Sequence, residues 1–337
     1  MMTNDAFHQW LDGDDTAEET VRGLADCETW PPAPLGGATT RRLIALAHDA
    51  LSRDPNRAVW ISRLATRAAK TLIDQGDAWR EYAAALLEVG EYEDAHAAVV
   101  RARMVYRMAE GTEHNEAVLG AVEGRILHEL GDSMRGLQRI DESARTLLRL
   151  NDKKTYVRVR SVYAAVLFNL GRYRDAAETY DAMADDYDPE TLAHAVNIIG
   201  RCAVKLGDIE RAKQCFETAL EMFEHLGLRA EMPRVRKGIA DVLLTHGRTH
   251  EAISELYKAR AEFLGMNLPV VAALVALDIV ELLLRVGRTS EIELLCDDRL
   301  PHSALRAFAG LRDLAGRATG QDVQRVRDVL ERLPMEA

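Results

Sequence analysis

The ten residues LLEVGEYEDA, 86–95, are the first of six related stretches in this 337-residue chain. A glycine stands fifth in each stretch, and successive glycines are 41, 40, 36, 40 and 40 residues apart. Such regular spacing is typical of a repeat architecture rather than of two independent globular domains. The other five stretches are LHELGDSMRG (127–136), LFNLGRYRDA (167–176), AVKLGDIERA (203–212), LLTHGRTHEA (243–252) and LLRVGRTSEI (283–292).

Residues at fixed distances from this glycine share size and polarity. Small side chains stand seven before and five after it, which lets two helices approach closely, and bulky apolar ones stand nine after it. The glycine itself suits a left-handed helix end. Each repeat is therefore predicted to be two antiparallel helices that bury their apolar faces by stacking. The columns are Ala83, Gly124, Ala164, Gly200, Ala240 and Val280; Ala95, Gly136, Ala176, Ala212, Ala252 and Ile292; and Val99, Ile140, Tyr180, Phe216, Leu256 and Cys296.

This layout resembles the tetratricopeptide repeat family. WREYAAAL (79–86) follows the family's W-x2-L-G-x2-Y pattern, and Ala176-x3-Tyr180 and Ala212-x3-Phe216 follow A-x3-F. The family repeat is about 34 residues, whereas this one averages 39.4, as in a long-helix variant found in bacterial signalling regulators. The resemblance implies an all-α, right-handed superhelical solenoid of about six to seven antiparallel helix pairs plus C-terminal capping helices.

Composition shifts divide the chain into four predicted segments. Residues 1–38 form an acidic N-terminal arm or linker, because their proline-rich part cannot continue a helix. Residues 39–76 read as a degenerate helix pair and 77–300 as the repeats. Residues 301–337 read as capping helices, near 302–316 and 320–333, that close the apolar end of the stack.

Charge is unevenly distributed. The net charge of −11 argues against a protein built to neutralise phosphates, and −7 of it lies in residues 1–38. We expect a cytoplasmic protein, because the first ten residues lack the pattern of a secretory signal and the four cysteines, at 27, 202, 215 and 296, show no CxxC spacing. The most apolar run, Leu268–Leu277, is too short to cross a membrane.

Catalytic, nucleotide and metal motifs are missing from the sequence. There is no GxxxxGK[ST], GxGxxG, GxSxG or HExxH. His246 and His250 have a metal-like spacing, but the turn glycine between them separates their faces. Cys202 and Cys215 are expected to be small buried apolar residues. We therefore expect no enzymatic activity and no cofactor or metal.

The resemblance also implies which residues face a ligand. The first helix of each pair lines the concave surface, with ligand-facing positions 13, 10, 6, 3 and 2 residues before the glycine. In the four middle sets, six of these positions are basic and two, Glu129 and Asp241, are acidic. Such a lane would attract an acidic peptide, although charged positions on a helix face are also simply solvated. The predicted peptide-binding residues are Arg125, Arg158, Asn169, His194, Asn197, Arg201, Lys205, Arg234 and Lys237.

The function predicted from these features is a protein- or peptide-binding scaffold or adaptor with a regulatory role. The alternative is a regulatory subunit of a larger bacterial signalling or defence assembly that binds through its convex face or its ends. Nucleic acid is disfavoured, because the ligand-facing positions lack a regular pair of base-reading residues. No membrane partner is expected, and a homo-oligomer stays open.

The N-terminal arm allows two interpretations. Phe7, Trp10 and Leu11 form an apolar cluster at helical spacing, and acidic residues follow them. Such a segment could occupy the basic groove and inhibit binding. Alternatively, it could pack on the first helix pair as a polar cap for the end of the solenoid.

Overall fold

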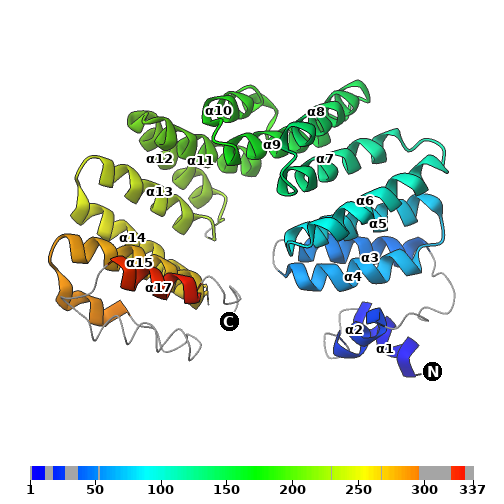
Figure 1. Cartoon of the computed structure of the whole chain (residues 1–337), viewed down its shortest axis with the longest axis horizontal. Coiled ribbons are helices and arrows are strands. Elements are labelled where there is room, and N and C mark those ends of the chain that lie inside the picture. The colour runs from blue at the N-terminus through cyan, green and yellow to red at the C-terminus, as the bar shows by residue number, and fades with distance from the viewer. Residues whose placement is uncertain are drawn as a thin grey trace. The chain divides into compact units, whose positions relative to one another are not determined.

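The computed structural model describes residues 2–11, 18–26, 37–51, 54–228, 230–266, 268–295 and 320–330. Within these ranges the chain forms sixteen α-helices and two short 3-10 helices, with no strand (Figure 1). The prediction of an all-α fold built from antiparallel helix pairs is thus confirmed. The chain divides into two compact units, residues 1–170 and 171–337, and each is described by itself.

Unit 1 contains three helix pairs, α3/α4, α5/α6 and α7/α8, with α9 packed on α8. The first helices form a common face, because α3 contacts α5, α5 contacts α7, and α7 contacts α9. We call this the first-helix face. The helices are α1 (Met2–Leu11), α2 (Glu18–Asp26), α3 (Gly37–Ala50), α4 (Pro55–Ala68), α5 (Leu72–Glu88), α6 (Tyr92–Arg107), α7 (Glu113–Glu129), α8 (Ser133–Arg149) and α9 (Lys153–Asn169).

Unit 2 repeats the arrangement with the pairs α11/α12 and α13/α14, and α11 contacts α13 along its own first-helix face. Its elements are α10 (Tyr173–Asp181), the 3-10 helix η2 (Ala184–Asp186), α11 (Pro189–Leu206), α12 (Ile209–His225), α13 (Met232–Thr245), α14 (Thr249–Gly265), α15 (Pro269–Arg285), the 3-10 helix η3 (Thr289–Leu295) and α17 (Gly320–Leu330). None of the described helices is long and apolar enough to span a bilayer.

The glycine of each repeat ends the first helix, as the sequence indicates. All six have φ between +70° and +89°, where a side chain would be strained. The small columns lie where helices touch. A Cβ on Gly124 would stand 2.6 Å from the carbonyl oxygen of Gly136, and a Cβ on Gly136 would stand 2.5 Å from that of Gly124. The α7/α8 pair therefore depends on two glycines facing each other.

The one short interval, 36 residues between Gly171 and Gly207, has a structural cause. The second helix of this repeat, α10, has only 9 residues, whereas α6 has 16 and α8, α12 and α14 have 17 each. The 3-10 helix η2 follows α10 and returns the chain to α11. The repeat is shortened in its second helix, whereas the first helices α9 and α11 keep 17 and 18 residues.

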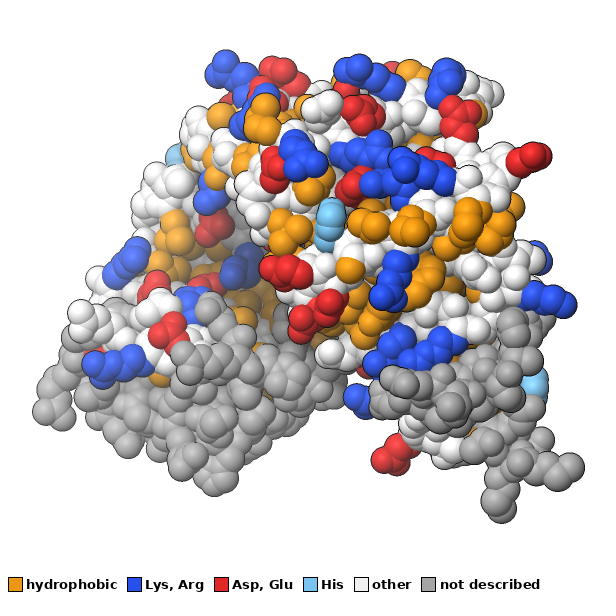
Figure 2. Space-filling model, turned by 45° about the vertical axis from the view of Figure 1, so that its right-hand side comes forward, with side chains coloured by type: hydrophobic (Ala, Val, Ile, Leu, Met, Phe, Trp, Pro, Cys, Tyr) orange, Lys and Arg blue, Asp and Glu red, His pale blue; other side chains and the backbone are white. Residues whose placement is uncertain are grey.

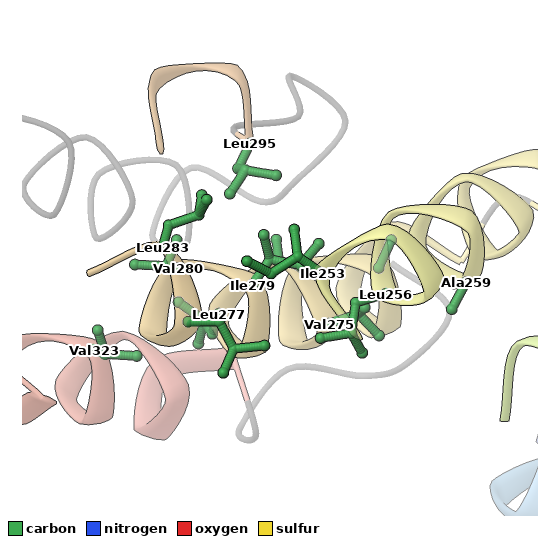
Figure 3. Packing of buried hydrophobic residues seen from close by; sticks show 14 of the residues in the cluster. Ile253, Leu256, Ala259, Val275, Leu277, Ile279, Val280, Leu283, Leu295 and Val323 are labelled. Atoms are coloured by element: carbon green, nitrogen blue, oxygen red, sulfur yellow. The ribbon is translucent and has the colours of Figure 1, made fainter. Parts of the chain in front are cut away.

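Both ends of the described chain bury apolar side chains on the repeats. Phe7, Trp10 and Leu11 are buried in a cluster with residues of α3 and α4, and the rings of Trp10 and Trp60 are 5.3 Å apart. The arm's apolar residues thus pack on the first helix pair. At the other end, Val323 of α17 joins the buried cluster of α14 and α15 (Figure 3). Residues 296–319, which hold Cys296 and the predicted helix near 302–316, lie outside the described residues.

Candidate functional site

A pocket of about 350 Å³ opens on the first-helix face of unit 1, between α7 and α9. Six of its eight lining residues occupy predicted ligand-facing positions, and the other two are the valines Val162 and Val166. The repeat register inferred from the sequence therefore brings side chains from two successive first helices together. The six are Arg125, His128, Glu129, Ser161, Ala165 and Asn169.

Most polar groups around this pocket have partners. Arg125 forms an ion pair with Glu88 of α5 at 2.9 Å. Nδ1 of His128 lies 2.8 Å from the hydroxyl oxygen of Ser133, and the Ser161 hydroxyl donates to the carbonyl of Val157 at 3.0 Å. Asn169 lies exposed at the last residue of α9. The pocket offers an apolar floor with hydrogen-bonding groups around it, an arrangement common in ligand-binding pockets.

Arg158 is the second basic residue predicted on α9. Its side chain is exposed and makes no ion pair within the part of the chain that the structure describes. Its charge still acts on α3, where His48 Nδ1 lies 2.9 Å from a carboxylate oxygen of Glu81. This hydrogen bond raises the pKa of His48, while burial and the charge of Arg158 oppose the rise. Arg158 is therefore an available cation close to an existing ion pair.

The predicted basic residues of unit 2 are partly neutralised. Lys237 pairs with Asp278 at 2.8 Å, and Arg234 pairs with Glu231 at 3.0 Å. Asp278 also binds Arg327 of α17, at 2.8 Å. The count of charged residues at ligand-facing positions did not include Asp278 and Glu231, because they lie one and three residues away from such positions. Figure 2, in which the right-hand side of Figure 1 comes forward, shows acidic side chains interspersed with basic ones on that face.

The pKa of Asp241 is affected by both positive and negative neighbours. Desolvation raises its pKa, the positive charge of Lys237 lowers it, the negative charge of Asp278 raises it, and Lys205 and Arg201 lower it. Lys205 itself makes no ion pair among the described residues. The first-helix face of unit 2 therefore carries alternating charges rather than a continuous basic lane.

Two further predicted residues, His194 and Asn197, lie on α11. His194 lies edge-on to Phe223, with ring centroids 5.0 Å apart and an interplanar angle of 67°. The side-chain oxygen Oδ1 of Asn197 is buried and has no hydrogen-bond partner among the described residues. A buried carbonyl oxygen left without a donor costs about 1–3 kcal/mol. Asn197 is thus an unsatisfied acceptor on a predicted ligand-facing position.

The nine predicted binding residues are divided between the two units. The pocket joins Arg125 and Asn169, and Arg158 lies on the same helix as Asn169, all in unit 1. The other six lie on α11 and α13 of unit 2. The structure therefore defines two candidate surfaces, one in each unit.

The described residues hold no cluster of His, Cys, Asp or Glu suited to a metal ion. Cys202 is buried and Cys215 is partly buried, and neither is in a disulfide. Burial raises the pKa of Cys202 to about 11 and also raises that of Cys215. Burial therefore disfavours the nucleophilic thiolate form of both cysteines.

These features define a class: a protein of stacked antiparallel helix pairs with a pocket on the face of its first helices. A family model described as tetratricopeptide repeat matches residues 199–262, which include all of α12 and α13. No curated protein sequence gives a significant match. The matched segment is thus similar to tetratricopeptide repeats, and the other described helix pairs share its architecture.

Solved structures of the same architecture extend over most of the chain. Aspartyl phosphate phosphatase F from Bacillus subtilis matches with a TM-score of 0.60 and 10% identity, over 88% of this chain and 71% of that one. The apo form of RapI matches with 0.56 and 13%, over 98% and 96%. A Rap protein complexed with Competence and Sporulation Factor matches with 0.57 and 12%, over 98% and 97%. At these identities the likeness shows the fold.

Proposed function

We propose that this protein is a peptide- or protein-binding regulator, and that the pocket between α7 and α9 anchors its ligand. The supporting observation is that six predicted ligand-facing positions line one pocket. The volume of about 350 Å³ falls within the ordinary range for ligand pockets, and Val162 and Val166 provide apolar contact. An apolar side chain of the ligand inserts there, while Arg125 and Asn169 bind polar groups of its backbone.

The ligand segment is acidic in this proposal. Arg158 and Lys205 are cations without ion pairs among the described residues. Arg125 and Lys237 already have carboxylate partners, so an acidic ligand exchanges one ion pair for another there and gains little. Electrostatics therefore contributes mainly to association rate and specificity.

Asn197 is a candidate contact of unit 2, considered by itself. Its unsatisfied Oδ1 accepts a hydrogen bond from a ligand N–H in this proposal, which removes the cost of burying it alone. The resemblance to a Rap protein crystallised with Competence and Sporulation Factor gives a precedent for a ligand-binding protein of this fold. That ligand is bound by the other protein. The proposal for this chain carries over only the general role of peptide or protein binding.

The test is a binding experiment with a blocked pocket. A randomised decapeptide library is screened against the full chain, and the selected peptides are titrated by fluorescence anisotropy. Ala165→Trp, which fills the pocket, is expected to weaken binding about tenfold or more. The matched control is Ala261→Trp, because Ala261 is an exposed alanine on α14. Equal binding by both variants would contradict the pocket assignment.

The preference for acidic residues in the ligand is tested separately with the same peptides. Arg158→Glu is expected to weaken an acidic peptide severalfold at low salt and to have little effect at high salt, because salt screens exposed charges. Exchange of the peptide's acidic residues for their amides should reproduce that loss. If the amide peptides bind as tightly as the acidic ones, the ligand is not selected for charge.

A further inference from the structure

The second helix α6 exposes a line of apolar side chains on the outside of unit 1. Val100, Met104 and Met108 are 42%, 62% and 64% exposed, and they are four residues apart. At about 1.5 Å rise per residue, the line is about 12 Å long on one side of the helix. Large apolar side chains exposed in a row are uncommon on a monomer surface and mark interaction sites.

Between residues 97 and 108 the exposed charged side chains are basic, and exposed acidic residues lie beyond both ends, at Glu93, Asp94 and Glu110. From residue 97 to 108 the exposed positions of α6 and its C-cap are Ala97, Val100, Arg101, Met104, Arg107 and Met108. The acidic residues of α6 are confined to its first turn. Arg101 stacks over the ring of Trp79 at 4.7 Å, which fixes its position beside the line. We call these six residues the α6 surface.

The second helices of this fold need no such surface, as α12 shows. The exposed residues of α12 are polar, and four of them are glutamates: Glu210, Lys213, Gln214, Glu217, Thr218, Glu221, Glu224 and His225. The two helices have similar lengths, 16 and 17 residues, and the same place in their pairs. The repeat therefore does not require such a line, although α8 also exposes Met134 and Leu148.

We infer that the α6 surface binds an amphipathic helix of a partner protein, with apolar residues on one side and acidic residues beside them. The apolar residues of the partner pack along Val100, Met104 and Met108. Its carboxylates pair with Arg101 and Arg107, and Arg107 has no ion pair among the described residues. Methionine suits this role, because its unbranched side chain adapts to the shape of a helix laid on it.

A membrane surface is the competing partner, and the geometry disfavours it. Membrane-surface helices carry large apolar residues, often Trp, Phe or Leu, over a broad face. The α6 surface has one narrow line, and it contains no exposed aromatic residue. Its two arginines are also too few to hold an anionic membrane, because each contributes only about 1 kcal/mol. A helix, which buries a narrow line, fits these dimensions better.

The experiment observes the methionines directly. The full chain is labelled with [methyl-¹³C]methionine, which gives ten methyl signals, and each is assigned by substitution. The probe is a synthetic helical peptide of about 18 residues with Leu along one side and Glu beside it, and the second probe has Lys in place of Glu. The acidic peptide is expected to shift the Met104 and Met108 signals. Met134, 75% exposed on α8, is the control within the molecule.

Charge reversal completes the test. Arg107→Glu is expected to weaken the acidic peptide about tenfold and to improve binding of the Lys peptide. Met104→Glu should abolish binding of both peptides, while Ala165→Trp in the α7–α9 pocket should leave it unchanged. Three outcomes overturn the inference: no shift at Met104 and Met108, equal shifts with both peptides, or shifts caused by phosphatidylserine vesicles and not by the peptide.

Discussion

The two units satisfy the same repeat pattern with different cores. In unit 1, Gly124 and Gly136 bring the backbones of α7 and α8 together, and the partly buried carboxylate of Glu123 joins neighbouring helices. In unit 2, glycines of α11 and α13 make room for a ring, as Gly76 does for the ring of Tyr106 in unit 1. Cβ atoms added to the unit 2 glycines would meet the ring of Phe216, at 3.0 Å from Gly200 and 2.5 Å from Gly238. Gly124 and Gly200, which share one column, thus lie against a neighbouring backbone and a large ring respectively.

The largest loss of stability is expected from a substitution in the core of unit 2. Phe216→Ala removes a fully buried ring that lies between two helices and leaves a cavity. We expect a loss of about 3–5 kcal/mol in the free energy of unfolding, measured by urea denaturation. Hydrogen exchange should quicken in α11 to α13 and stay unchanged in α5 to α8, because repeats interact mainly with their neighbours. Phe216→Leu should cost clearly less; a similar loss would mean that ring volume is not what stabilises this core.

A second substitution breaks the polar core of unit 1. Glu123 of α7 accepts hydrogen bonds from Arg103 of α6 and Arg139 of α8, the latter at 2.6 Å. Burial alone would raise the pKa of Glu123, but the two arginines outweigh it and lower the pKa. Glu123→Ala leaves two partly buried guanidinium groups without this partner, and we expect a loss of about 3 kcal/mol.

The matched control for this change is Glu142→Ala, which removes an exposed carboxylate 3.3 Å from Arg139. It should cost less than about 1 kcal/mol. Because the pKa of Glu123 is lowered in the folded chain, its stabilisation is present above the ordinary pKa of a glutamate. It is lost as pH falls through the lowered value. If Glu123→Ala and Glu142→Ala cost the same in chemical denaturation, the buried bridge does not distinguish unit 1.

The contrast between units also shows what the sequence could predict. The turn glycines and the small columns follow from spacing, and the structure confirms them. Left-handed residues at the ends of second helices were missed, namely Gly111, Asn151 and Gly227, with φ of +71°, +57° and +71°. Their signal was present, because each follows a turn glycine by 20 or 21 residues. This spacing was hard to recognise, because one repeat has Asn151 where the other two have Gly111 and Gly227.

The binding surface was harder to predict than the fold. Repeat register alone placed Arg125, Ser161 and Asn169 at one pocket, because it fixes which faces of α7 and α9 meet. Ion pairs depend on neighbouring positions as well, so counting charges at ligand-facing positions overlooked Asp278. The exposed methionines of α6 could not be separated from core residues by hydropathy, since the sequence does not say which apolar positions are covered.

A smaller loss of stability is expected from a substitution at the α7/α8 contact. Gly136→Ala adds a methyl group where its Cβ would lie 2.5 Å from a backbone oxygen, and backbone cannot move aside as a side chain can. Helix propensity favours alanine by about 1 kcal/mol, so we expect a net loss of about 1–2 kcal/mol in thermal or chemical unfolding. Gly265→Ala, at an α14 position with nothing within 4 Å of the added Cβ, should be neutral or stabilising. A stabilising Gly136→Ala would show that the two helices have room to separate.

The smallest expected effect is a pH dependence confined to unit 1. Glu81 accepts from His48 and raises its pKa, with Asp49 adding to the rise and Arg158 opposing it. A raised folded pKa means that the stabilisation is complete below the ordinary histidine pKa of about 6.5 and is lost as pH rises through the raised value. Because the His48 side chain is 56% exposed, solvent limits the effect to about 0.5 kcal/mol. His48→Gln keeps a hydrogen-bond donor without titrating, so the difference in stability between the native chain and this variant should shrink from pH 5.5 to 8.5. A constant difference over that range would show that the contact between His48 and Glu81 does not stabilise unit 1 through the charge of His48.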